Sequence, residues 1–464
     1  MRLQPALYGT VPSDTLVIAL TPMKPAFIIT ILLSVSIISF AEAQRVSTTP
    51  AAASSASVTA DSSQSAPTTE YTLPPDKLAK SKALYEISGR MRTVGTIWGF
   101  VVLLGILFLG VMAHFRNWAE RASHNSFVQA LVAIPLFIVV LNALDWPLSA
   151  YGHHISLQYG LSVQHWGSWF ADVLKGLALS LVVSTLLLWL MFWIIRRSPR
   201  RWWFYFWLII LPVIVFFAVI APVVIDPMFN KFEPLDKTNP QLVDSIETVL
   251  HRGGVIIPRD RMFLMKASEK VTTLNAYVTG FGPSKRVVVW DTTIQKATTP
   301  ETLFVFGHEM GHYVLNHVMI GLGAAAIGLF IGLYLLYRLS GWFLRRWGQR
   351  WHIRELGDWA ALPMIFLIFS ILGFFAQPIS AGVSRVLEHN ADVYGLEVTH
   401  GINANSQEAA ARAFQVLGEL SLVYPYPNRF LVFWYWDHPT IADRVRFAHQ
   451  YDPWDNGQQP KYVK

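Results

Sequence analysis

The chain has 464 residues, of which 53% are hydrophobic and 14% are charged, and its mean hydropathy is +0.37. This composition excludes an ordinary soluble globular protein and favours a membrane protein. The chain has no cysteine, which excludes disulfides, thiolate metal sites and a cysteine nucleophile. The net charge of +7 comes with arginine clusters beside apolar segments, so it indicates orientation in a lipid bilayer and no nucleic-acid partner.

The N-terminal residues 1–43 have the features of a secretory signal peptide or a first membrane segment. Lys24 precedes a short apolar run that ends in Ala41-Glu42-Ala43, a small-x-small pattern typical of signal cleavage sites. Residues 44–75 are rich in Ser, Thr, Ala and Pro, which predicts a disordered linker.

Apolar stretches that follow the linker are long enough to cross a bilayer as helices, which takes about 20 residues each. There are six of them, at residues 94–113, 127–146, 173–195, 203–225, 318–338 and 359–383. We therefore predict an α-helical multi-pass membrane protein with six or seven transmembrane helices. Four spans lie in an N-terminal membrane region, 76–225, and the other two form a hairpin, 318–383.

Two polar regions, 226–317 and 384–464, are expected to pack together because neither holds enough apolar residues for its own core. In the first region, 273–279 and 286–290 are predicted strands joined by a turn, which indicates a small α/β subdomain. One strand could be a sheet edge to which a peptide substrate adds, with Asn275 and Ala276 nearest the cleft. The alternative is an ordinary hairpin without a binding role.

The strongest chemical signal is the sequence HEMGH at residues 308–312. Thr299 is expected to cap a helix there, with Pro300 as its first residue. On a helix, the two histidines are four residues apart and can bind one metal ion together, as in zinc peptidases. Glu309 then lies beside the ion, where a general base for zinc-bound water belongs. The alternative is a pair of structural histidines near the membrane.

A catalytic zinc ion commonly takes three protein ligands and leaves the fourth position to water. His317 lies five residues after His312 and is expected to point off the ligand face. Glu388 is the better candidate, because it follows a membrane hairpin that returns the chain to the side of the HEMGH motif. Asp392, four residues later, could orient a zinc-binding histidine without touching the ion.

Five segments, in the same order, resemble the CAAX prenyl protease 1 family (type I, a-factor-converting) and, more distantly, the HtpX-type membrane peptidases. They are IDPMFNKFEPL at 225–235, LNAYVTGFGPSKRVVVWDTTI at 274–294, FGHEMGHYVLNH at 306–317, SRVLEHNADVYG at 384–395 and DHPTIADRVRFA at 437–448. The resemblance extends over residues 75 to 450. It implies a zincin-like (gluzincin) fold with one Zn²⁺ on His308, His312 and Glu388, and Glu309 as the base.

The resemblance also implies that His438 and Arg444 line the site, that the spans enclose a chamber, and that the substrate is a peptide or protein. Eukaryotic members of the family process prenylated C-terminal CAAX peptides. From the chemistry of the residues, His438 could donate a hydrogen bond to the developing oxyanion. Arg444 could bind a substrate carboxylate or hold Asp392.

Other functions remain open at this point. An HtpX-type peptidase would degrade membrane proteins for quality control. A site-2-type protease would carry its HExxH motif inside a span, whereas here the motif follows a long polar region. A transporter-like protein with a metal-binding domain would place charged residues in mid-span, where this chain has almost none. An inactive scaffold would have no need of Glu309.

Arginine distribution predicts the orientation. Short loops on one side carry Arg116, Arg121, Arg196, Arg197, Arg200, Arg201, Arg338, Arg345, Arg346, Arg350 and Arg354. The loop on the other side, 146–172, has no Lys or Arg. The positive-inside rule places the arginine-rich loops in the cytoplasm, so both polar regions are expected on the extracytoplasmic side of the cell membrane.

Overall fold

The computed structural model describes residues 70–464 except 281–284, 456 and 464. The predicted signal segment and most of the predicted linker lie outside the described residues. Within the described part, six helices are long and apolar enough to cross a membrane. They are α2 (Pro75–Phe108), α4 (Ser126–Gln158), α5 (Trp166–Arg197), α6 (Trp202–Ile220) with η1 (Ala221–Ile225) and α7 (Asp226–Phe229), α12 (His317–Trp347), and α13 (Leu362–Thr399) preceded by η5 (Trp359–Ala361).

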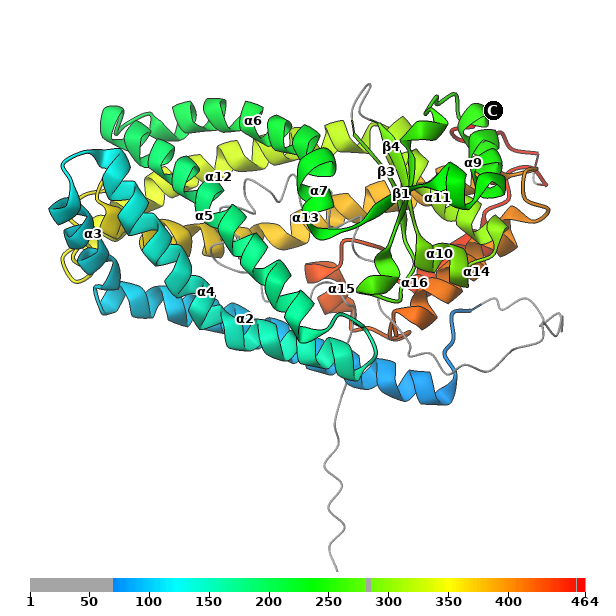
Figure 1. Cartoon of the computed structure of the whole chain (residues 1–464), viewed down its shortest axis with the longest axis horizontal. Coiled ribbons are helices and arrows are strands. Elements are labelled where there is room, and N and C mark those ends of the chain that lie inside the picture. Colours follow the sequence, from blue (N-terminus) through cyan, green and yellow to red (C-terminus); the bar gives the residue numbers. More distant parts are fainter. Residues whose placement is uncertain (1–69, 281–284, 456, 464) are drawn as a thin grey trace, which may run out of the picture.

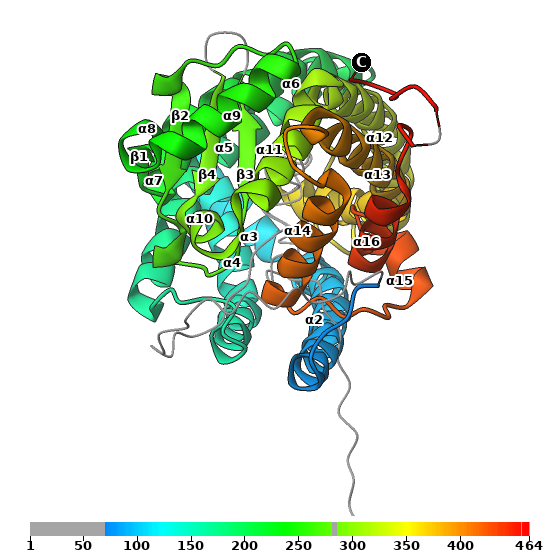
Figure 2. The same ribbon diagram turned by 90° about the vertical axis from the view of Figure 1, so that its right-hand side faces the viewer.

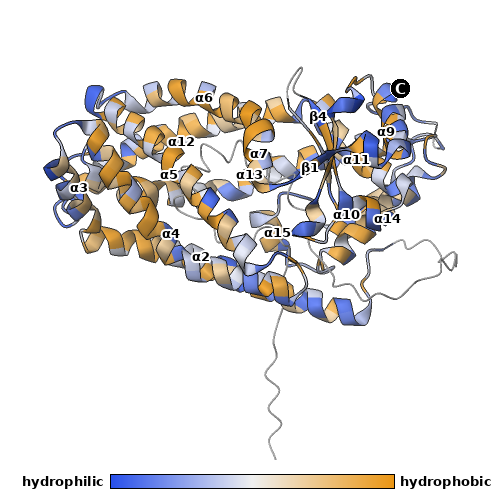
Figure 3. Ribbon diagram, in the orientation of Figure 1, coloured by the Kyte–Doolittle hydropathy of each residue, from blue (hydrophilic) through white to orange (hydrophobic). Residues whose placement is uncertain are grey.

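The long helices run side by side along the longest axis of the molecule, and the sheet lies with the short helices at one end (Figure 1). Apolar residues cover much of the surface of the long helices (Figure 3). Val182 on α5 is 61% exposed, and Ile327 on α12 is 64% exposed. Such a continuous exposed apolar surface is stable in contact with lipid rather than water. The predicted multi-pass membrane fold is confirmed.

A buried ion pair lies at the arginine-rich end of the molecule. Helix α3 (Val111–Ala122) carries Arg116, whose guanidinium lies 2.6 Å from Asp358 and also donates to the carbonyl of His352. Asp358 in turn accepts from the backbone N–H of Ala360 at the start of η5. Because Arg116 and Asp358 are both buried, the pair joins α3 firmly to the chain that enters α13.

At the other end, four strands form a sheet in the order β1-β2-β4-β3. The predicted strand pair is present as β3 (Ala276–Thr279) and β4 (Arg286–Trp290), which are antiparallel, and β3 is the edge strand. The sequence did not indicate β1 (Phe232–Pro234) or β2 (Met262–Met265), which complete the sheet. Strand β4 is buried throughout, with Val287 and Val289 packed in the same core as Phe306 of α11 (Thr299–Val314).

The helices around the sheet and behind it are short. They are α8 (Leu235–Thr238), α9 (Pro240–Arg252), η2 (Arg259–Arg261), η3 (Ala267–Glu269), α10 (Asp291–Lys296), α14 (Ser406–Leu420), α15 (Arg429–Tyr435) and α16 (Ile441–Gln450). Seen from this end, α11 lies between the sheet and the group formed by α13, α14 and α16 (Figure 2). The two polar regions therefore pack on each other, with α11 shared between them.

The N-cap of helix α11 lies one residue before the expected cap. Thr298, rather than Thr299, is the N-cap, and it forms a capping box with Glu301. The Glu301 carboxylate accepts from the backbone N–H of Thr298 at 2.8 Å and is also held by Arg412. Pro300 consequently lies at the second helical position. A capping box needs Glu three residues after the cap, and this spacing selects Thr298.

Glycines allow α11 and α13 to approach closely. A Cβ atom added at Gly395 of α13 would lie 3.0 Å from the backbone nitrogen of His308. One added at Gly307 of α11 would lie 2.8 Å from Val398. At Gly311, one turn later, it would lie 3.0 Å from Tyr394. The crossing thus depends on residues without side chains along one face of α11.

Residues 461–463 bind to α13 at Glu397. The fully buried carboxylate of Glu397 accepts hydrogen bonds from the backbone N–H groups of Lys461, Tyr462 and Val463, and from the Tyr451 hydroxyl. Val463 is itself buried in the core shared by the sheet and α11. These bonds stabilise the part of α13 that faces α11.

The helix crossing gives the first prediction. Gly395→Ala should lower the stability of the purified protein by about 1–3 kcal/mol, because the new methyl group meets backbone that cannot move aside. Gly373→Ala is the matched control on the same helix, since a Cβ there meets nothing within 4 Å. Thermal unfolding in detergent should show a lower midpoint for Gly395→Ala alone. Equal midpoints would contradict the close crossing.

Candidate metal centre

Three side chains from α11 and α13 converge on one point. The Nε2 atoms of His308 and His312 are 3.2 Å apart. Glu388 lies opposite, with Oε2 3.3 Å from His308 Nε2 and Oε1 3.4 Å from His312 Nε2. Zinc bonds to nitrogen and oxygen are about 2.0–2.2 Å long, and tetrahedral angles then place ligand atoms about 3.3–3.6 Å apart. The observed separations fit such an ion.

The charges of these three side chains also favour a bound cation. Glu388 is 2% exposed, and its Oε2 atom is buried without a hydrogen bond. A buried carboxylate needs positive charge beside it, which a bound metal ion can supply together with His438. Burial lowers the pKa of His312 to about 3, so its imidazole is neutral and its lone pair is free for a metal. Both observations fit a divalent ion.

Asp392 and Arg444 hold His308 on the side of its ring that faces away from Glu388. Asp392 Oδ1 lies 2.8 Å from His308 Nδ1, one helical turn along α13 from Glu388. Arg444 of α16 donates two hydrogen bonds to Asp392, at 2.9 Å and 2.5 Å, and its guanidinium stacks on Phe414. An acceptor at Nδ1 fixes the tautomer that leaves the Nε2 lone pair for a metal. Of the two predicted roles for Arg444, this geometry favours holding Asp392.

His317 contacts His312, and the sequence did not indicate this contact. Its Nδ1 atom lies 3.0 Å from His312 Nδ1, and its side chain is buried. The expectation that it points off the ligand face assumed one continuous helix. In the structure α11 ends at Val314, and Asn316 adopts a left-handed conformation with φ of 56° before α12 begins. That turn carries His317 back to the ring of His312.

Glu309 and His438 are the groups suited to moving and holding protons. Burial raises the pKa of Glu309 to about 7, so its carboxyl can accept and return a proton near neutral pH. His438 Nε2 lies 3.1 Å from Glu388 Oε2, and Nδ1 lies 2.8 Å from Asp437. Burial opposes protonation of His438, but Glu388 and Asp437 outweigh it and raise its pKa to about 10. A protonated His438 is a hydrogen-bond donor.

Asn275 and Ala276 lie at the edge of the sheet that packs against α11. The Asn275 backbone is already bonded within the sheet region, since its N–H donates to Thr293 and its carbonyl accepts from Trp290. Ala276 is paired with Val289 in the antiparallel register. Because residues alternate in such a pair, the N–H and C=O of Ala276 point away from β4, and the residue is fully buried.

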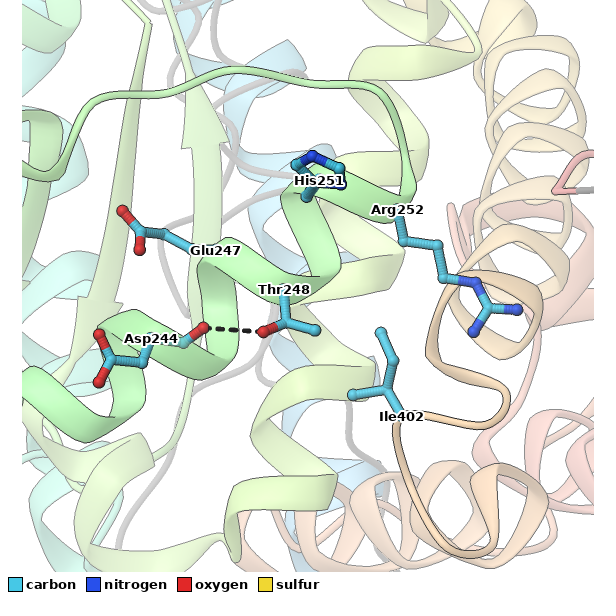
Figure 4. Close-up of a pocket in the computed structure, with 6 residues that line it drawn as sticks. All are labelled: Asp244, Glu247, Thr248, His251, Arg252 and Ile402. Atoms are coloured by element: carbon cyan, nitrogen blue, oxygen red, sulfur yellow. Dashed lines mark hydrogen bonds between the residues drawn. The ribbon is translucent and has the colours of Figure 1, made fainter.

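A groove of about 520 Å³ lies elsewhere, on the outer face of α9 (Figure 4). Its lining residues are Asp244, Glu247, Thr248, His251, Arg252 and Ile402. Thr248 donates to the carbonyl of its own helix at Asp244, and the acidic side chains point outward (Figure 4). None of these residues belongs to the histidine and glutamate cluster.

Comparison with known proteins covers both parts of the chain. Residues 57–231 match the model described as CAAX prenyl protease N-terminal, five membrane helices, and residues 236–452 match Peptidase family M48. The uncharacterized metalloprotease YhfN of Bacillus subtilis is 34% identical over 81% of this chain and 86% of its own length. CAAX prenyl protease 1 of Saccharomyces cerevisiae is 27% identical over 75% of this chain and 76% of its own.

A solved structure shares the fold. The crystal structure of S. mikatae Ste24p matches with a TM-score of 0.67 over 94% of this chain and all of that chain, at 22% sequence identity. The likeness therefore extends through the long helices as well as the sheet and the short helices around it.

The second prediction concerns His317. His317→Ala should weaken metal binding about 10–100-fold, the usual effect of removing a group that orients a ligand. His114→Ala at the opposite end of the molecule is the control, because its side chain is exposed and remote. Competition with a fluorescent zinc chelator measures both variants. An affinity equal to that of the unmodified chain would remove His317 from the support of His312.

Proposed function

This chain belongs to peptidase family M48 and is a multi-pass membrane metalloprotease of the CAAX prenyl protease type, and we propose that it holds one zinc ion on His308, His312 and Glu388. The observation that carries the proposal is the convergence of these three side chains at separations that suit a tetrahedral ion. Regions 226–317 and 384–464 would then act as one catalytic unit.

The proposed reaction is hydrolysis of a peptide bond. A bound zinc ion supplies polarisation of the scissile carbonyl and a lower pKa for the attacking water. Glu309 takes the proton from that water and later passes it to the leaving amine, which its raised pKa favours. His438, held by Asp437, donates a hydrogen bond to the oxyanion. Arg444 acts through Asp392 and keeps His308 in the tautomer that binds the metal.

We further propose that the substrate is a peptide segment bound as an extended strand along β3. On its side away from β4, Ala276 would offer one backbone donor and one acceptor, which is how a sheet edge binds a peptide, once the peptide displaces what covers this buried residue. Asn275 would then contribute its side chain, since its backbone is already bonded. The relatives named CAAX prenyl protease suggest a C-terminal segment near the membrane as the substrate class.

For the cellular arrangement, we propose the cell membrane, with the catalytic unit on the extracytoplasmic side. The support is the arginine bias of the short loops, which lie at the end of the molecule remote from the sheet.

The third prediction separates the roles of the motif residues. Glu309→Gln should retain one metal ion per chain and lose peptide cleavage, because an amide cannot accept the proton. His312→Ala should lose both the metal and the cleavage. Metal analysis of the purified protein together with a peptidase assay distinguishes the two. Full zinc occupancy in a His312→Ala, Glu388→Ala double variant would overturn the ligand assignment.

The fourth prediction tests orientation in this cysteine-free chain. Ile256→Cys places a thiol on the catalytic unit at a side chain that is 88% exposed. Gln349→Cys places one at the arginine-rich end, also on an exposed residue. A membrane-impermeant thiol reagent should label Ile256→Cys in intact cells and Gln349→Cys only after lysis. The reverse pattern would place the catalytic unit in the cytoplasm.

A further inference from the structure

The short helix α15 presents an aromatic face that no described residue covers. Tyr426, just before the helix, is 67% exposed, and Phe430 and Phe433 within it are 61% and 54% exposed. Three large aromatic side chains on one face are a costly surface to leave in water. Figure 2 shows α15 at the margin of the molecule, beside α16.

Contacts with two spans fix α15 in place. Arg385 of α13 donates to the carbonyls of Val432 and Trp436 at the end of α15. On the other side, the backbone N–H of Asn428 donates to the Tyr85 hydroxyl of α2, and Arg92 of α2 stacks on Tyr435 at 4.7 Å. Helix α15 therefore sits between the first and the last described spans.

Helix α13 also carries exposed apolar residues, on another side from its contacts with α15. Phe375, Ile379 and Val386 are 64%, 72% and 60% exposed. At 3.6 residues per turn, they lie about 180–220° around α13 from Glu388, so they face away from the metal-binding residues. Ring contacts join α15 to a different side of α13, from Phe374 to Trp434 at 5.1 Å and from Trp434 to Phe430 at 5.5 Å.

The position of α15 along α13 corresponds to the edge of the bilayer. Its contacts with α13 run from Phe374 to Arg385, which at 1.5 Å per residue lie about 18 and 35 Å from the start of the helix at Leu362. The hydrocarbon core of a bilayer is about 30 Å thick. The level of α15 is therefore the outer half of the core and the boundary beyond it, where aromatic residues are enriched.

We propose that α15 is an interfacial helix whose face of Tyr426, Phe430 and Phe433 lies in the headgroup–acyl boundary of the lipid bilayer on the catalytic side. The helix ends at Tyr435, and His438 follows within three residues. Lipid contact at α15 thus sets the depth of His438 relative to the membrane. The inference rests on the membrane fold and the exposed residues, and is independent of the proposed zinc chemistry.

The test uses single cysteines labelled with an environment-sensitive fluorophore in liposomes. Phe433→Cys reports on α15, Val182→Cys at the middle of α5 is the control inside the bilayer, and Ile256→Cys is the control in water. Lipids carrying a nitroxide near the headgroup or deep in the acyl chain serve as quenchers. The Phe433→Cys label should be quenched more by the shallow nitroxide, the Val182→Cys label by the deep one, and the Ile256→Cys label by neither.

Two results would overturn the proposal. Quenching of the Phe433→Cys label by aqueous iodide but not by either lipid would place α15 in water. A blue-shifted label that neither iodide nor lipid quenches would mean that protein covers the face, either a second copy of the chain or another partner. Phe430→Cys provides an independent reading of the same face if Phe433→Cys does not fold.

Discussion

The contact between α11 and α13 is the constraint on which the catalytic end depends. One helix supplies two histidines and the other supplies the carboxylate, so the metal-binding set exists only when the helices are close. Gly307 and Gly395 permit that approach, because a methyl group at either would meet a side chain or the backbone of the other helix at 3.0 Å or less. Capping at Thr298 and the buried bonds of Glu397 hold the two helices from outside the crossing.

The charged side chains near the crossing of α11 and α13 favour a bound cation. Glu309, Glu388 and Asp392 bring three carboxyl groups to this small region, where Arg444 is paired with Asp392 and His438 lies 3.1 Å from Glu388. The partner of the Nδ1 atom decides whether the Nε2 atom of each histidine donates a hydrogen bond or binds a metal ion. Asp392 and His317 occupy the Nδ1 sides of His308 and His312, so both Nε2 atoms face Glu388. The supporting residues therefore orient the set toward a metal rather than toward one another.

The sequence predicted what depends on local pattern and on length. Long apolar runs predicted the spans, and two short segments joined by turn residues predicted the strand pair. Strands β1 and β2 were not predicted because they have only three and four residues and take their order from tertiary pairing. The contact of His317 with His312 depends on the left-handed turn at Asn316, which helical periodicity cannot reveal. The close crossing at Gly307 and Gly395 was not predicted, because the sequence does not show which helices meet.

Helix α13 is both a span and the carrier of Glu388, so under the proposed ligand assignment it sets where catalysis occurs relative to the bilayer. The apolar stretch ends near residue 383, and five more residues place Glu388 about 7–8 Å farther along the axis. Hydrolysis needs water, whereas a membrane-bound peptide needs proximity to lipid, and this level satisfies both. Because Arg385 on the same helix turn holds α15, the depth of His438 is set by the same element that sets the depth of the carboxylate. Glu388 and the segment that carries His438 are therefore held by one helix.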